Sequence, residues 1–362
     1  MISYWILFII PAFLALIGRV EFYPSKYSYK SRNFGFLWWS IIITLTLMIG
    51  FRFQVGGDWG NYLNTYINIQ NLSLKDAFNN ATFMADPAFL ILNWLSAQVN
   101  FGVYGVNLVL GAIFAYGLAR FCKQLPRPLL GLVSAIPYLV IVVGMGYSRQ
   151  AGALGFGLLA LVALQENKKL KFFLWILLAA TIHKTALLLL PLAGLAASTN
   201  RIYIIFWLVM IFTLSYIFLL AQAVSFLYEH YIQDSYQSSG AFIRIAMTFV
   251  PSIIFLLYKK RFKFSQEKED LWKWIAYFTI LCMAVLMLTS ISAALDRMAL
   301  YFLPMQIMVF SYLPDLFGNR GRVNQVIKIL IISYYGLVLF VWLNFAYHAG
   351  NWLPYRNLLF EW

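Results

Sequence analysis

The sequence predicts an all-α integral membrane protein with about twelve transmembrane helices. Of the 362 residues, 62% are hydrophobic and 11% are charged, and the mean hydropathy is +0.76. Apolar segments of roughly 15 to 20 residues recur along the whole chain, which is close to the length that a helix needs to cross a bilayer. The polar stretches between them are too short for a soluble domain. We therefore expect residues 1–362 to form a single polytopic membrane domain.

The distribution of charge predicts which loops face the cytoplasm. Loops that alternate along the chain contain 20 of the 27 lysines and arginines but only 6 of the 13 acidic residues. Basic loops tend to remain on the cytoplasmic side of a membrane. The other loops are neutral overall, so the net charge of +14 is a topology signal and not a nucleic-acid-binding surface. This assignment places both termini on the outer side.

The same pattern sets the approximate path of the chain. The predicted spans lie near residues 2–19, 34–51, 103–121, 129–147, 150–165, 171–183, 185–198, 202–222, 241–258, 273–292, 297–316 and 327–346. The first segment has no basic region before it and no cleavage site after it, which favours a retained span over a signal peptide. The spans at 171–183 and 185–198 are short for a complete crossing, so we expect them to meet part-way through the membrane. The apolar segment that begins at Pro87 would break the alternation if it crossed. We expect it to be re-entrant or interfacial, within an outer loop that covers residues 52–102.

Basic side chains stand at the outer ends of several predicted spans. They are Arg52, Arg149, His183, Lys184 and Arg297. An arginine costs about 2.5–3.5 kcal/mol at the centre of a bilayer and less near its surface, so it tends to face a partner or a water-filled cavity. The alternative for each residue is that it extends to the lipid headgroups. Because the whole set shares one membrane level, the sequence favours a cationic site on the outer side.

The outer loop after the second predicted span adds carboxylate and aromatic groups. Arg52 and Asp58 flank the pair Gly56-Gly57, which would let the backbone approach a ligand closely. The aromatic residues that follow, beginning with Trp59, have helical spacing and predict an interfacial helix. A second aromatic and acidic loop, at residues 223–240, is expected to be an ordinary solvated loop.

A cationic site with carboxylates and aromatic rings suits an anionic, lipid-linked sugar. Arginine side chains bind phosphate oxygens through paired hydrogen bonds. A diphosphate leaving group also needs its developing negative charge stabilised as the bond breaks.

Six sequence segments carry a family resemblance, and they occur in a characteristic order. They read "GFRFQVGGDWGNY", "DPAFLILN", "YSRQAGALGFGLLAL", "HKTALLLLP", "DRMALYFLP" and "NWLPY". This set resembles the EpsG family of exopolysaccharide polymerases, which are relatives of the Wzy O-antigen polymerases. Members usually have glutamate where this chain has Asp86, so the sequence departs conservatively from the pattern at that position.

The resemblance implies a glycosyltransferase with a GT-C-like membrane fold. Such an enzyme transfers a growing glycan from undecaprenyl diphosphate to the distal sugar of a lipid-linked repeat unit, at the outer face of the bacterial cytoplasmic membrane. The diphosphate ligands that the resemblance implies are Arg52, Arg149 and Arg297, and the implied general base is Asp58 or His183. We add Lys184 as a further candidate for the diphosphate, and Trp59, Tyr62 and Gln150 as candidate sugar contacts. We expect neither a cofactor nor a metal ion. The expected partners are the undecaprenyl diphosphate-linked oligosaccharide and membrane lipid, with a chain-length regulator and a flippase as further candidates and no nucleic acid.

Two other function classes fit part of the pattern. A flippase for lipid-linked oligosaccharides would also need a cationic cavity, but it would need no general base and would often have two pseudo-symmetric halves, which the sequence lacks. A membrane acyltransferase could use His183 as its base. Its acyl donor is cytoplasmic, however, so its cationic residues should lie on the opposite side.

Overall fold

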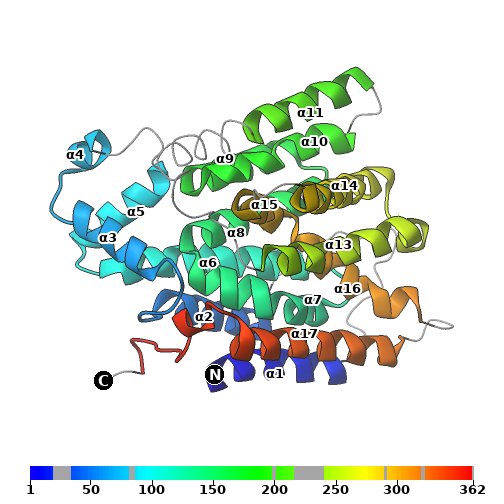
Figure 1. Cartoon of the computed structure of the whole chain (residues 1–362), viewed down its shortest axis with the longest axis horizontal. Helices are drawn as coiled ribbons and strands as arrows, with labels where there is room; N and C mark the ends of the chain where they lie inside the picture. Colours follow the sequence, from blue (N-terminus) through cyan, green and yellow to red (C-terminus); the bar gives the residue numbers. More distant parts are fainter. Residues whose placement is uncertain are drawn as a thin grey trace.

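The computed structural model shows a bundle of helices whose axes mostly follow the long axis of the molecule (Figure 1). It describes residues 1–18, 34–80, 86–197, 201–215, 240–288, 292–318 and 323–360. Within these ranges the regular elements are helices, and β-structure is limited to one isolated antiparallel bridge between Arg52 and Asn357. The predicted all-α class is therefore confirmed for this part of the chain. The predicted outer loop at 223–240 lies outside it except for Gly240.

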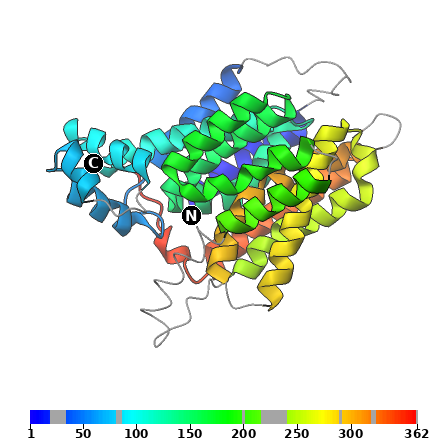
Figure 2. The same cartoon turned by 90° about the horizontal axis from the view of Figure 1, so that it is seen from above.

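The helices fall into a main bundle and a smaller group at one end. The bundle contains α1 (Ile2–Ile17), α2 (Phe36–Gly50), α6 (Gly102–Cys122), α7 (Pro128–Ala135) with the π-helix η1 (Ile136–Gly144), α8 (Ser148–Gln165), α9 (Lys169–Ile182), the 3-10 helix η2 (Lys184–Leu189), α10 (Pro191–Ala197), α11 (Arg201–Ser215), α13 (Ala241–Tyr258) with η4 (Lys259–Phe262), α14 (Gln266–Leu288), α15 (Ser292–Ala299) with η5 (Leu300–Phe302), α16 (Pro304–Leu316) and α17 (Gln325–Phe345). The smaller group contains α3 (Trp59–Ile69), α4 (Leu74–Asn79) and α5 (Pro87–Gln98), and the short helix η6 (Ala349–Asn351) follows α17. Figure 2 shows the smaller group, in blue and cyan, beside one end of the bundle.

Several helices have the length and composition of membrane spans. Among the described residues, four helices meet both criteria: α6, α13 with η4, α14 and α17. Three shorter apolar helices are α1, α2 and the continuous α7–η1 segment. These helices are consistent with a polytopic membrane protein, while the total of twelve spans and the GT-C-like fold stay predictions.

One end of the bundle joins the loops that are rich in lysine and arginine, and we call it the basic end. Arg127, just before α7, forms two hydrogen bonds of 2.9 and 2.7 Å with Asp315 of α16. Lys328 in the first turn of α17 donates 3.0 Å hydrogen bonds to the carbonyl oxygens of Ala15 and Leu16 at the end of α1. Residues 127, 315 and 328, which lie in or beside two of these loops, therefore lie with the end of α1 at one end of the structure.

The opposite end carries both chain termini and the smaller helix group, and we call it the terminal end (Figure 1). The phenol of Tyr4 donates a 2.8 Å hydrogen bond to the carbonyl of Trp352, which lies after η6. The backbone N–H of Gly56 donates a 2.8 Å bond to the carbonyl of Asn351. The N-terminal helix, the loop at 51–58 and the C-terminal segment are thus held together.

Small residues bring α6 and α8 into close contact. A Cβ atom added to Gly117 of α6 would collide with the carbonyl of Gly155 in α8, and one added to Gly155 would lie 2.6 Å from the carbonyl oxygen of Ile113. Side chains larger than hydrogen would therefore push the helices apart, which is the usual role of glycine in membrane helix packing. This packing fixes the position of α8, whose first turn carries Arg149 at the terminal end.

The two short predicted spans at 171–183 and 185–198 correspond to a broken helical segment. Helix α9 ends at Ile182, His183 has an extended backbone, and the chain continues as η2 and α10. Helix α5, which the sequence placed in the outer loop, packs against α3, α6 and α9 at the terminal end. These two features bring residue 86 and the break at residue 183 next to each other.

Candidate active site

Arg149 lies in the first turn of α8 at the terminal end of the bundle. Its guanidinium stands over the ring of Phe89 at 5.2 Å and over the ring of Tyr62 at 5.9 Å. One nitrogen, Nη1, donates a 3.3 Å bond to Oδ2 of Asp86, and 39% of the side chain is exposed. Within the described residues the guanidinium makes no other hydrogen bond or ion pair, so most of its five N–H groups remain available to a ligand.

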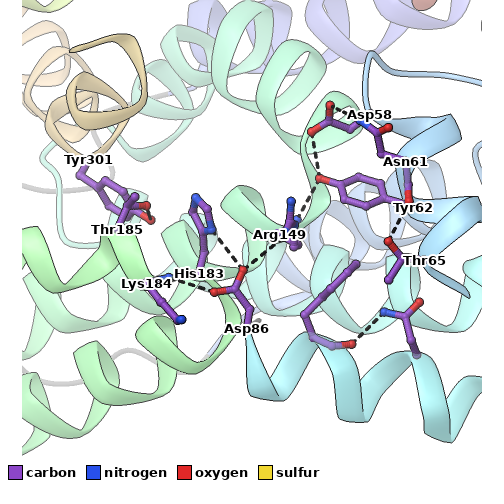
Figure 3. A network of polar contacts seen from close by, with 12 residues as sticks. Asp58, Asn61, Tyr62, Thr65, Asp86, Arg149, His183, Lys184, Thr185 and Tyr301 are labelled. Carbon is purple, nitrogen blue, oxygen red and sulfur yellow. Dashed lines mark hydrogen bonds and ion pairs between the residues drawn. The ribbon is translucent and has the colours of Figure 1, made fainter. Parts of the chain in front are cut away.

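Asp86 is the acceptor on which three segments of the chain converge (Figure 3). It precedes Pro87 at the start of α5, but its side chain does not cap that helix. Its Oδ2 atom lies 3.3 Å from Nη1 of Arg149 and 3.4 Å from Nδ1 of His183, while Oδ1 accepts a 3.3 Å bond from the backbone N–H of Lys184. Only 7% of the Asp86 side chain is exposed. The carboxylate is therefore enclosed by donors and charge.

His183 and Lys184 reach Asp86 because the helix breaks between α9 and η2. The extended backbone at His183 turns its ring toward the carboxylate, and the next backbone N–H, which has no intrahelical partner at the start of η2, also points at it. The second ring nitrogen of His183, Nε2, is buried and has no hydrogen-bond partner among the described residues. Beside this break, Thr185 and Tyr301 of η5 share a 3.1 Å hydrogen bond.

Asp58 lies on the other side of Arg149, immediately before α3. Its oxygens accept 3.4 Å bonds from the amide of Asn61 and the phenol of Tyr62. The Tyr62 oxygen in turn accepts a 3.5 Å bond from the backbone N–H of Arg149. Burial, and then the Asp58 carboxylate, raise the pKa of Tyr62. The phenol therefore stays protonated and donates a hydrogen bond to Asp58. Asp58 is thus connected to Asp86 through Tyr62 and then Arg149.

Arg52 does not join this cluster, because its guanidinium is completely buried under the loop at 51–58. It donates to the carbonyl oxygens of Ile49 and Val55 at 2.6 and 3.0 Å, and to Asn107 and Ser148 at 3.4 and 2.6 Å. Burial lowers the pKa of Arg52 to about 10. Among the described residues no ion pair joins Arg52 to Asp58.

The first residue of the glycine pair has a packing role in the structure. Gly56 has a φ of +105°, and a Cβ atom there would collide with the carbonyl of Met145. Glycine is therefore required at position 56 because the loop packs closely against the segment just before α8. A Cβ added to Gly57 would make only ordinary contacts with Trp352 and Tyr147.

Three other predicted residues lie around the cluster without a bond to it. Trp59 packs against Phe53 and Tyr104, and Gln150 is half-buried in the first turn of α8. Arg297 of α15 is exposed, and it forms no hydrogen bond or ion pair within the described ranges.

Sequence reasoning named His183, Lys184, Arg149, Asp58 and Tyr62, and the structure brings all five into one network. It missed the central position of Asp86, which it noted only as a departure from a pattern. The available signal was an acidic residue directly before proline at the start of an apolar segment. In the described part of the chain, no group of three or more histidine, cysteine, aspartate or glutamate side chains could hold a metal ion.

Comparison with known proteins identifies the family. No curated protein and no solved structure gives a significant match. Residues 35–357 match the sequence profile of the EpsG family, so the match includes every residue of the polar network described above. Since the match extends over nearly all of the 362 residues, the chain belongs to the EpsG family.

Proposed function

We propose that this protein is a polysaccharide polymerase that uses a lipid diphosphate-linked donor. In this proposal it transfers a growing glycan from undecaprenyl diphosphate to the distal sugar of a lipid-linked repeat unit. Membership in the EpsG family supports the polymerase and glycosyltransferase class. The donor, the acceptor and a GT-C-like fold are parts of the proposal.

The availability of Arg149 is the observation on which the donor assignment depends. Other arginines at the ends of the bundle are already engaged: Arg127 and Arg244 form paired bonds with Asp315 and Asp296, and Arg52 is buried among four acceptors. Arg149 is half-exposed and has one long contact, to Asp86. A guanidinium with unused N–H groups can bind two phosphate oxygens at once.

We assign Arg149, Arg297 and Lys184 to the diphosphate. Their charges would stabilise the leaving group as the bond to the reducing-end sugar breaks. Arg52 is excluded from this set because binding a phosphate would require it to give up its internal hydrogen bonds; we propose that it holds the loop at 51–58 against α6 and α8. The general base is Asp58 or His183, which stand on opposite sides of Arg149.

Among the candidate sugar contacts, the assignment of Tyr62 changes. The ring of Tyr62 is 3% exposed and lies against Phe89 and Arg149, so it is better suited to bridge Asp58 and Arg149 than to stack on a sugar. Trp59 and Gln150 are only partly buried and stay candidates for sugar contacts.

The proposal places the terminal end of the bundle on the outer face of the bacterial cytoplasmic membrane. The concentration of lysines and arginines at the basic end supports this orientation, since such loops tend to stay in the cytoplasm. Lipid-linked repeat units would then reach Arg149 from the outer leaflet.

Reconstitution tests the proposal directly. The purified protein is placed in vesicles with lipid-linked repeat units isolated from host cells in which its gene is deleted. A ladder of lengthened glycans is the expected product. A flippase would move the repeat units across the membrane without lengthening them, and an acyltransferase would modify them without adding sugars, so either result would refute the polymerase assignment.

A further inference from the structure

The two ring nitrogens of His183 have different surroundings. Nδ1 lies 3.4 Å from Oδ2 of Asp86. An ionised carboxylate can only accept hydrogen bonds, so this contact places the proton of the neutral ring on Nδ1. The other nitrogen, Nε2, then carries a lone pair that can accept a proton.

The Asp86 carboxylate is itself held in a defined orientation. Its Oδ1 atom accepts from the backbone N–H of Lys184, the residue after His183, while Oδ2 faces both His183 and Arg149. Two consecutive residues of the break between α9 and η2 therefore contact the two oxygens of one carboxylate. Contacts of 3.3 and 3.4 Å are long, but such bonds often tighten only when the substrate is bound.

Nε2 of His183 is the unusual atom of this arrangement. It is shielded from solvent, has no hydrogen-bond partner among the described residues, and points away from Asp86 in Figure 3. Most buried polar atoms in folded proteins have a partner, so an exception calls for a functional explanation. Asp58 differs in this respect, because both of its oxygens already accept bonds from Asn61 and Tyr62.

We propose that Asp86 is a positioning residue that holds His183 as the general base of the transfer. This inference rests on the polymerase function proposed above and decides between its two candidate bases. The acceptor hydroxyl oxygen forms a bond to the anomeric carbon of the donor glycan. The bond from that carbon to the diphosphate oxygen breaks, its electron pair leaves with the diphosphate, and the hydroxyl proton passes to Nε2. Because Nε2 is shielded, the binding of the acceptor sugar must move the side chains that cover it.

The test separates donor binding from glycan extension. Donor binding is measured with undecaprenyl diphosphate, and extension with lipid-linked repeat units isolated from the deletion host. His183→Gln should lower the extension rate by about 10²–10⁴-fold and change donor affinity by less than about threefold. Asp86→Asn should lower extension over a similar range. It should leave donor affinity unchanged or slightly improved, because the carboxylate no longer competes with phosphate for Arg149.

Variants that combine or partly restore these groups show whether Asp86 acts through His183. The double variant Asp86→Asn/His183→Gln should be no slower than His183→Gln alone, since the two residues form one functional unit. Asp86→Glu keeps a carboxylate and should recover extension to within about tenfold of the wild-type rate. His348→Gln and Asp76→Asn are matched controls at exposed positions of the terminal end, and both should keep full activity.

Each outcome has a defined meaning. Multiplicative losses in the double variant, equal losses of donor binding and extension in Asp86→Asn, or no recovery in a folded Asp86→Glu would overturn the inference. Loss of extension in Asp58→Asn with full extension in His183→Gln would do the same and assign the base to Asp58. If the wild-type protein itself lengthens no glycan, the proposed function fails and the inference falls with it.

Discussion

Replacing Arg149 by alanine should weaken donor binding far more than it weakens the fold. The folded protein loses one partly exposed ion pair with Asp86, worth about 0–1 kcal/mol. It also loses a contact with the ring of Phe89, worth about 0.5–1 kcal/mol. Asp86 retains its contacts with His183 and with the backbone of Lys184. The contact with the ring of Tyr62 adds about 0.5–1 kcal/mol, so the total cost to folding is about 3 kcal/mol at most.

The cost to donor binding is larger because Arg149 can offer two unused N–H groups to phosphate. Each charge-assisted hydrogen bond contributes about 1.5–3 kcal/mol, so a paired contact contributes about 3–6 kcal/mol. This range corresponds to roughly 10²–10⁴-fold weaker binding of undecaprenyl diphosphate. Arg149→Lys keeps the charge but not the forked geometry, and it should lose about 10–10²-fold.

The assay compares purified variants in the same detergent. Thermal denaturation reports the fold, and titration with undecaprenyl diphosphate reports donor binding. Arg356→Ala is a matched control, because Arg356 is also exposed at the terminal end but lies outside the polar network. If Arg149→Ala binds undecaprenyl diphosphate within threefold of the wild-type affinity, the phosphate assignment is wrong. The alternative, that the Arg149 side chain reaches to the lipid headgroups, then explains this arginine.

Three further predictions concern the other arginines and the topology. Arg297→Ala should weaken donor binding by about 10–10²-fold, for one lost charge-assisted bond, with an unchanged thermal midpoint; unchanged affinity would remove Arg297 from the site. Arg52→Lys should lower the thermal midpoint, because one ammonium cannot reach two carbonyls and two side chains. Each buried acceptor that is left unpaired costs about 1–3 kcal/mol. The folded fraction of this variant should nevertheless bind donor normally. In intact cells, a membrane-impermeant thiol reagent should label Ser73→Cys but not Ser265→Cys. Background labelling should be low because both native cysteines are buried. The reverse pattern would invert the proposed orientation.

The family and much of the site composition can be read from the sequence. Short motifs around Arg149, His183 and Arg297 occur in a characteristic order, and the family match over residues 35–357 confirms that interpretation. Their common membrane level also follows from the sequence, because each residue stands at the end of an apolar segment. The structure brings Arg149, His183 and Lys184 to one carboxylate.

The difference in burial between the side chains of Arg52 and Arg149 could not be predicted from the sequence. Both follow long apolar stretches and both adjoin glycine-containing segments. Arg52 is buried because the loop at 51–58 folds over it and the C-terminal segment pairs with that loop through Asn357. Burial by a segment about 300 residues away leaves no pattern in the sequence around Arg52.

The sequence by itself determined the helical class and the family, and it predicts a separation of the basic loops from the level of the candidate site residues. These properties depend on hydropathy and charge, which each segment possesses before it folds. Only the tertiary structure decided that Asp86 is the centre of the polar network, because its three donors lie 63, 97 and 98 residues away. They meet because α8 packs closely on α6, α5 returns to the terminal end, and the chain breaks at His183. Contacts over such separations arise from packing between elements, and no local pattern of residues encodes them.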